Sequence, residues 1–210
     1  MHDHSQDNLS GAFAARAAAD LVNTYANWSS TYDDEAMRLG YCLPFVITAW
    51  VARYAESLES KILDAGCGTG LTGPYLAALG YGDLHGLDFS PEMLERAGRR
   101  GVYRSLTRGE LGKALDWQDA TFDLILSAGV FTQGHAPASS FDELLRILKP
   151  GGYLTFTIRD ITLETHEFDG ALKAMLHQRR ASLVEKSPPF RSFTTSNPDI
   201  AVNVMVLQKL

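Results

Sequence analysis

An acid followed by three alternate glycines is the stretch of this sequence whose residue types could do chemistry. The string K-I-L-D-A-G-C-G-T-G places Asp64, Gly66, Gly68 and Gly70 after a short apolar run. Without a Cβ, a glycine can adopt positive φ, admit a ligand to the backbone, or let a helix pack closely on a strand. A strand, a glycine turn and a helix bring N–H groups and a helix N-terminus to a ligand. The stretch therefore predicts a site for a nucleotide-like molecule.

The spacing of these residues limits the class of ligand that the site could bind. A dinucleotide fingerprint reads G-x-G-x-x-G, whereas this chain reads D-x-G-x-G-x-G. A carboxylate at Asp64 would repel a pyrophosphate and would suit a ligand with a cationic amino group. Asp88 follows roughly 20 residues after the turn, where α/β nucleotide sites place a carboxylate on the ribose hydroxyls. Phe89 and Met93 come next and suit the face of an adenine, and Ser90 is a natural N-cap for the helix that contains Met93.

Several strings resemble one family, the class I (Rossmann-like) S-adenosylmethionine-dependent methyltransferases. The acid with alternate glycines is similar to the family's first motif. The string D-F-S-P-E-M-L-E-R-A, which begins at Asp88, is similar to the second motif, and L-K-P-G-G-Y-L, which begins at Leu148, is similar to a later motif. G-V-Y-R-S-L and T-F-D-L-I-L make the chain most similar to the Williams–Beuren-region methyltransferase-like proteins. An N-terminal lid of the pattern Y-D-x-W-A-x-x-Y-D resembles the segment with Tyr25, Trp28, Tyr32 and Asp33. These aromatic residues either close over the cofactor or cap the sheet.

The resemblance implies S-adenosylmethionine as the cofactor, with its methionine end and ribose in the glycine loop. Leu106 and Thr107 stand where relatives approach the adenine amino group, although many relatives have an aspartate there. The expected cofactor-binding residues are Asp64, Gly66, Gly68, Gly70, Asp88, Phe89, Met93, Leu106, Thr107, Ser127, Tyr25 and Tyr32. Phe131, Gln133, His135 and Trp28 are expected on the substrate side. The sequence offers no metal-site spacing and no assigned catalytic residue, because His135 is either a proton acceptor or an ordinary polar contact.

The order of apolar runs and helical patterns predicts a three-layer, doubly wound α/β fold. With the resemblance, it implies a mostly parallel seven-stranded sheet that closes with an antiparallel C-terminal hairpin. We expect a flexible N-terminus over 1–10 and a single methyltransferase domain over 11–210. Within that domain, 11–57 forms N-terminal helices and a lid, 58–160 the cofactor-binding core, and 161–210 a C-terminal helix and the hairpin. Expected boundaries include a third strand at 102–106, a helix at 165–183, and closing strands at 184–193 and 200–207.

Composition limits the partners. The chain has 210 residues, 45% of them hydrophobic, a net charge of −6 and an isoelectric point of about 5.5. An acidic chain is a poor match for a phosphate backbone, so we expect a small-molecule substrate and no nucleic acid. There is no apolar run of about 18 residues, residues 1–10 lack the apolar core of a signal peptide, and Cys42 and Cys67 do not form a disulfide framework. A cytoplasmic protein without membrane contact is therefore expected.

The family resemblance implies an enzyme that transfers a methyl group from S-adenosylmethionine by direct displacement, and the composition favours a small molecule as the acceptor. Two alternatives remain at this point. A non-catalytic S-adenosylmethionine-binding sensor or partner subunit would have the same cofactor half. A nucleotide-dependent oxidoreductase is disfavoured by Asp64 and by the glycine spacing. The acceptor, the choice among O-, N- and S-methylation, the need for a base and the oligomeric state stay open.

Overall fold

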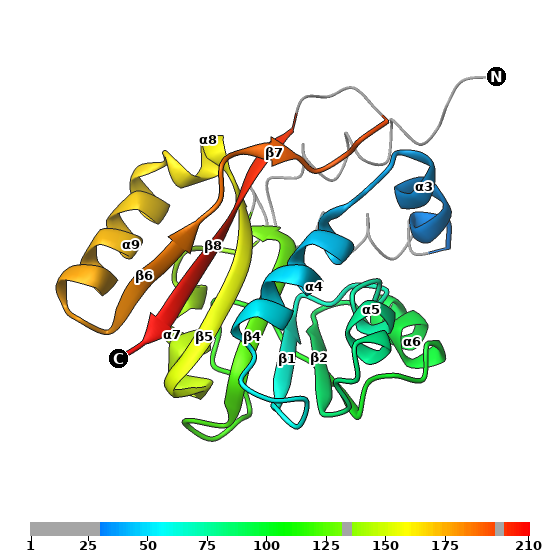
Figure 1. Cartoon of the computed structure of the whole chain (residues 1–210), viewed down its shortest axis with the longest axis horizontal. Coiled ribbons are helices and arrows are strands. Elements are labelled where there is room, and N and C mark those ends of the chain that lie inside the picture. The colour runs from blue at the N-terminus through cyan, green and yellow to red at the C-terminus, as the bar shows by residue number, and fades with distance from the viewer. Residues whose placement is uncertain (1–29, 132–135, 196–199) are drawn as a thin grey trace.

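A single twisted sheet with helices on both faces forms the body of the protein (Figure 1). The computed structural model describes residues 30–131, 136–195 and 200–210. Its helices are α3 (Tyr32–Arg38), α4 (Leu43–Tyr54), α5 (Gly73–Ala78), α6 (Pro91–Arg99), α7 (Ser140–Ile147), α8 (Asp160–Leu163) and α9 (His166–His177). Its strands are β1 (Ile62–Ala65), β2 (Leu84–Asp88), β3 (Ser105–Arg108), β4 (Phe122–Phe131), β5 (Leu148–Arg159), β6 (Ala181–Lys186), β7 (Phe190–Arg191) and β8 (Ala201–Lys209).

The strand order explains where a ligand site must lie. Five strands are parallel in the order β3-β2-β1-β4-β5, and β8 then inserts antiparallel between β5 and β6. Asp64 of β1 is in register with Gly86 of β2 and Leu126 of β4, so the carboxyl ends of these strands meet at one edge. The mostly parallel sheet with an antiparallel C-terminal part is confirmed. Within the described residues it has eight strands, because the strand that two prolines interrupt consists of β6 and β7.

Alternate residues of the strands supply the two hydrophobic cores. On one face, Ile62 and Leu124 pack with apolar side chains of α4 and α5. On the other face, Leu63 and Ile125 pack with α7 and α9. Because both faces are covered, all four residues of β1 are buried. This rigid central strand ends directly at the glycine turn and fixes where the turn begins.

Two element boundaries differ from the sequence prediction. The helix expected at 165–183 is wrong beyond His177, because Arg179 takes φ of 55° and residues 181–186 pair with β8. The third strand begins at Ser105 and not at residue 102, because its register is set by pairing with β2. In both cases a pairing distant in sequence decides the structure. Residues 1–29, which include Tyr25 and Trp28, and residues 132–135, which include Gln133 and His135, lie outside the described residues.

Candidate cofactor site

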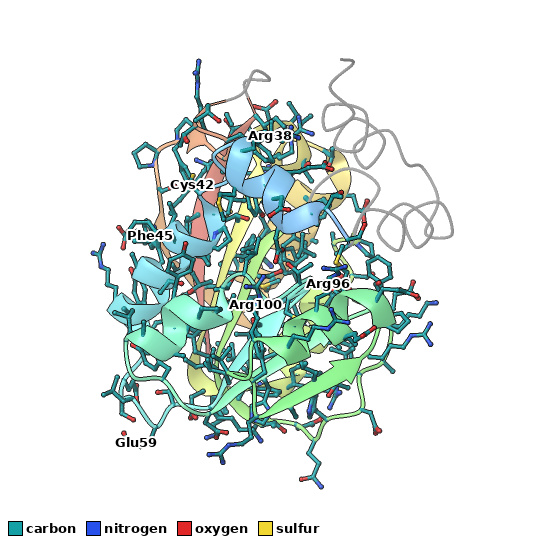
Figure 2. The ribbon with its side chains drawn as sticks, turned by 90° about the vertical axis from the view of Figure 1, so that its right-hand side faces the viewer. Arg38, Cys42, Phe45, Glu59, Arg96 and Arg100 are labelled. Carbon is teal, nitrogen blue, oxygen red and sulfur yellow. The ribbon has the colours of Figure 1, made fainter. Side chains whose placement is uncertain are left out.

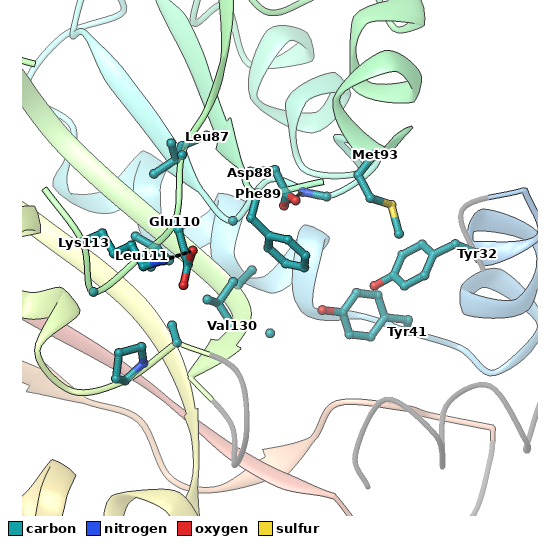
Figure 3. A pocket seen from close by; sticks show the side chains of 18 residues that line it. Tyr32, Tyr41, Leu87, Asp88, Phe89, Met93, Glu110, Leu111, Lys113 and Val130 are labelled. Atoms are coloured by element: carbon teal, nitrogen blue, oxygen red, sulfur yellow. Dashed lines mark hydrogen bonds and ion pairs between the residues drawn. The ribbon is translucent and has the colours of Figure 1, made fainter. Parts of the chain in front are cut away.

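A cavity of about 320 Å³ opens at the carboxyl ends of the parallel strands (Figure 3). Four strand ends contribute to it, which is where open α/β sheets bind their ligands. Tyr32 and Tyr41 from the N-terminal part of the described chain form the wall opposite the strands. The cavity is lined by Tyr32, Tyr41, Gly66, Gly68, Leu87, Asp88, Phe89, Met93, Gly109, Glu110, Leu111, Gly112, Lys113, Ala128, Gly129, Val130, Ala136 and Pro137.

The glycine turn forms the floor of this cavity. Gly66 has φ of +79°, and a Cβ built on it would lie 2.4 Å from Cγ2 of Val130. A side chain there is therefore excluded both by backbone conformation and by space. Gly68 has φ of +55°, and a Cβ on it would meet nothing within 4 Å. The backbone at Gly68 is thus open to the cavity, whereas Gly70 packs against the ring of Tyr103 outside it.

Asp88 is held rigidly in the cavity wall. Its Oδ2 accepts a hydrogen bond of 2.9 Å from the backbone N–H of Gly68, and its Oδ1 accepts one of 2.9 Å from that of Ser90. The residue is only 7% exposed. Burial raises its pKa, against the lowering effect of the backbone N–H donors. Each carboxylate oxygen still has acceptor capacity for a second donor, so a fixed two-oxygen acceptor faces the cavity beside the open glycine turn.

The helix after Asp88 begins as the sequence predicts. The Ser90 hydroxyl accepts a hydrogen bond of 3.3 Å from the N–H of Met93, and Pro91 occupies the first turn of α6. This cap fixes the start of α6 relative to the end of β2. Phe89 and Met93 consequently both line the cavity, as expected for neighbours of an adenine or ribose.

Asp64 was expected to bind the cofactor, but its side chain lies outside the cavity lining. It is buried, is not among the residues that line the cavity, and accepts a hydrogen bond of 2.7 Å from the phenol of Tyr103. Burial raises its pKa to about 7, with a further increase from the charge of Asp88 and a decrease from the Tyr103 bond. Asp64 is therefore held at the end of β1 by Tyr103, outside the cavity lining. Its contact with a cationic amino group stays a prediction.

Three other expected site residues also lie outside the cavity lining. Leu106 and Thr107 belong to β3, where Leu106 packs against Gly86. The Ser127 hydroxyl is buried and donates a hydrogen bond of 2.8 Å to the carbonyl oxygen of Ala65.

Phe131, expected on the substrate side, is fully buried in the core. Its ring lies 4.9 Å from that of Phe141 and 5.3 Å from that of Phe156, measured between centroids. A register irregularity between Ser127 and Phe131 precedes this inward turn. Such irregularities commonly redirect a side chain at the end of a strand, and here they take Phe131 away from the cavity.

The structure adds lining residues that the sequence reasoning missed. Glu110 and Leu111 follow β3 and take the place expected for Leu106 and Thr107. The Glu110 carboxylate pairs with Nζ of Lys113 at 2.7 Å, as the dashed line in Figure 3 marks. The sequence signal for Glu110 is the G-E dipeptide directly after β3, comparable to the acids at the ends of β1 and β2; the predicted strand ended at residue 106, two residues before the observed end.

Tyr41 is a second missed residue. A Cβ on Gly129 would lie 2.3 Å from the Tyr41 phenol oxygen, so Gly129 is needed to admit this ring to the end of β4. Tyr32 and Tyr41 share a hydrogen bond. The pKa of Tyr32 is raised, first by burial and then by the negative charges of Asp33 and Asp88. Two phenol rings therefore close this side of the cavity.

Comparison with known proteins agrees with this arrangement. The Methyltransferase domain family matches residues 63–156. Methyltransferase-like protein 27 of Homo sapiens is 35% identical over 152 residues, which are 70% of this chain and 62% of that protein. The 18S rRNA (guanine-N(7))-methyltransferase of Bos taurus is 39% identical over 72 residues, 34% of this chain and 25% of that protein. The chain thus spans less than two thirds of the length of these curated relatives.

The fold comparison gives the same class. The structure of a TehB-like S-adenosylmethionine-dependent methyltransferase from Corynebacterium glutamicum superposes with a TM-score of 0.62 at 22% identity, covering 90% of this chain and 99% of that chain. That similarity concerns the fold. Together with the domain match and the site geometry, it identifies an α/β protein of the Rossmann-like methyltransferase type. Residues 63–156 match a methyltransferase domain, and the chain is similar to the class I S-adenosylmethionine-dependent methyltransferases, as its sequence motifs predicted.

The residues present fit the cofactor of this family, S-adenosylmethionine. The volume lies in the range of small-molecule sites, roughly 300–1,000 Å³. Asp88 offers two oxygens to a ribose, Phe89 and Met93 offer apolar surface, and Gly68 leaves backbone open to the cavity. Over the described parts of the chain, no group of acids, histidines and cysteines is arranged to hold a metal ion, and no helix is long and apolar enough to cross a membrane.

Proposed function

We propose that this protein transfers a methyl group from S-adenosylmethionine to a small-molecule acceptor by direct displacement. The observation that carries the proposal is Asp88, a buried carboxylate fixed by two backbone N–H groups beside an open glycine turn. A rigid acceptor of this kind recognises a pair of adjacent hydroxyls, such as those of a ribose. The family match supports the identity of the nucleoside.

The chain's own residues would serve chiefly to bind and orient. Asp88 would hold the ribose, Phe89 and Met93 would flank the nucleoside, and the turn at Gly66 and Gly68 would receive the part nearest the end of β1. When bound, S-adenosylmethionine supplies a methyl group already activated by its sulfonium charge. Alignment of two reactants can lower the activation free energy by roughly 7–11 kcal/mol, so residues that bind and orient the reactants suffice for a large acceleration. We assign no base among the described residues.

Two observations support a small acceptor over a nucleic acid. The net charge of −6 opposes a polyanion. Among the described lining residues the only cation is Lys113, and it is paired with Glu110. One relative is named as an 18S rRNA methyltransferase, but it matches over only 34% of this chain. The small-molecule acceptor therefore remains our proposal for the whole protein.

The test is release of S-adenosylhomocysteine, measured by mass spectrometry. Purified protein and S-adenosylmethionine are incubated with a desalted metabolite extract, with total RNA, or with buffer. We expect product, and a metabolite heavier by one methyl group, with the metabolite extract.

Asp88→Ala should give no product, whereas Asp83→Ala, at the opposite end of β2, should behave like the wild type. Product with RNA alone would contradict the small-molecule acceptor. Tight cofactor binding without turnover in any mixture would favour the sensor or partner-subunit alternative.

A further inference from the structure

A three-part contact joins the glycine turn to α3 and to the end of α6. The hydroxyl of Thr69 donates a hydrogen bond of 2.6 Å to Oδ1 of Asp33. The guanidinium of Arg100 donates through Nη2 to Oδ2 of Asp33 at 2.5 Å and through Nε to the carbonyl oxygen of Thr69 at 2.5 Å. We call Asp33, Thr69 and Arg100 the loop clamp. Figure 2 shows Arg100 in the central part of the face that carries α3 and α6.

We infer that Asp33 and Arg100 are positioning residues that hold the glycine turn and the Tyr32 wall together around the cofactor. The inference rests on the proposed function, because it takes this turn as the cofactor's binding loop. Neither residue lines the cavity. Both would act through Thr69 and Tyr32, and their effect would be on how long the cofactor stays bound.

The loop clamp holds the glycine turn at Thr69, between two conformationally permissive glycines. Thr69 lies between Gly68 and Gly70, both with positive φ, and glycines impose little rigidity of their own. Thr69 as a residue is nevertheless only 1% exposed. The adjacent N–H of Gly68 donates to Asp88. The turn is therefore held from one side by Asp88 and from the other by Asp33 and Arg100, so loss of the clamp would disturb the bond that orients Asp88.

The same clamp fixes the opposite wall. Asp33 directly follows Tyr32 at the start of α3, and the Tyr32 ring lines the cavity close to Met93 in Figure 3. Tyr32 also shares a hydrogen bond with Tyr41. Loss of the Asp33 contacts would therefore increase the mobility of both the glycine turn and the Tyr32 wall. An isolated surface ion pair would not connect two parts of the cavity in this way.

The chain offers a matched control on α6. Arg99 stands beside Arg100 but pairs with Glu95 at 2.6 Å, and its side chain is 67% exposed, against 22% for Arg100. Asp34, which is exposed, stands beside Asp33 in the same helical turn and provides the second control. Arg99→Gln and Asp34→Asn therefore remove the same charges without touching the clamp.

Stopped-flow measurement of S-adenosylhomocysteine dissociation tests the inference. We expect Asp33→Asn and Arg100→Gln each to raise the dissociation rate constant about tenfold, the effect of losing a charge-assisted hydrogen bond. The double variant should be slower than the product of the two single effects predicts, because both substitutions break the same bond between Asp33 and Arg100. Arg99→Gln and Asp34→Asn should match the wild type. Equal rates in all proteins, or additive effects in the double variant, would overturn the inference while leaving the proposed function intact.

Hydrogen exchange of the ligand-free proteins provides a readout that does not need binding. Arg100→Gln should speed exchange in α3 and in residues 66–70 together, and Arg99→Gln in neither. Acceleration confined to α6 would overturn the inference. Failure of the wild type to bind S-adenosylhomocysteine would refute the proposed function, and the exchange experiment would still decide whether the clamp exists. Should Arg100→Gln not fold, Thr69→Val should reproduce the effect and Thr69→Ser, which keeps the donor hydroxyl, should not.

Discussion

Replacing Asp64 with asparagine should make the protein more stable at neutral pH. Burial raises the pKa of Asp64 from its ordinary 3.8 to about 7 in the folded protein. The unfolded chain releases this proton near pH 3.9, so between the two values the folded state binds more protons. The free energy of unfolding therefore falls as the pH rises from about 4 to about 7. Asparagine carries no charge, and its Oδ1 can still accept from the Tyr103 phenol.

The size of the effect follows from the two pKa values. One pKa unit corresponds to about 1.36 kcal/mol, so Asp64 alone removes about 4 kcal/mol of stability over the full range. Between pH 5 and pH 8 the loss is about 2.5 kcal/mol. The stability of Asp64→Asn relative to the wild type should rise by that amount over this interval, and little of the gain should remain near pH 4.

Urea unfolding followed by circular dichroism at pH 5, 6, 7 and 8 provides the measurement. The exposed Glu95→Gln variant serves as the control and should run parallel to the wild type, because its partner Arg99 is also exposed. A difference between Asp64→Asn and the wild type that stays constant from pH 5 to pH 8 would refute the assignment of a buried, proton-retaining carboxyl at the end of β1.

Three further substitutions test the site and the core. Asp88→Asn should weaken S-adenosylhomocysteine binding about 10- to 100-fold by calorimetry, with Asp83→Asn unchanged; equal affinities would remove Asp88 from the site. Gly70→Ala should cost about 2–4 kcal/mol in thermal unfolding, since φ is +77° and the new Cβ would lie 2.9 Å from the Tyr103 ring. Phe131→Ala should cost about 3–5 kcal/mol because the ring is fully buried; a neutral effect would argue against its place in the core.

Local signals made the cofactor half of the fold predictable. The glycine turn, the acid that ends β2 and the Ser90 cap are each defined by a few neighbouring residues, and each has the predicted structure. Gly66 shows why such signals are strong, because both its φ and the contact with Val130 exclude any other residue. The short apolar run of Ile62 and Leu63 likewise predicted a strand, and the structure has β1 there, buried on both faces.

The remainder depends on contacts between distant residues, which leave no local signal. The hydrogen bond from Tyr103 to Asp64 spans 39 positions, and nothing in the spacing predicts it. The extent of β3 follows from its register with β2, and an error of two residues at the end of this strand was enough to select Leu106 in place of Glu110. The bond from Arg100 to Asp33 spans 67 positions and is likewise visible only in the structure.

The same dependence explains the misplaced C-terminal helix. Residues 181–183 continue the helical pattern of α9 in sequence, but the backbone turns at Arg179 and Ala181 pairs with Lys209. A strand beside β8 extends the sheet and buries Ala181. Sheet formation therefore overrides the local helical preference at this point.

A crystal structure with bound S-adenosylhomocysteine would test the central claim most directly. We expect the two ribose hydroxyls within hydrogen-bond distance of the Asp88 carboxylate, the sulfur near the end of β1, and the adenine between Phe89 and the Glu110–Leu111 segment. A nucleoside bound elsewhere, or a ribose with no contact to Asp88, would contradict the assignment of this cavity as the cofactor site.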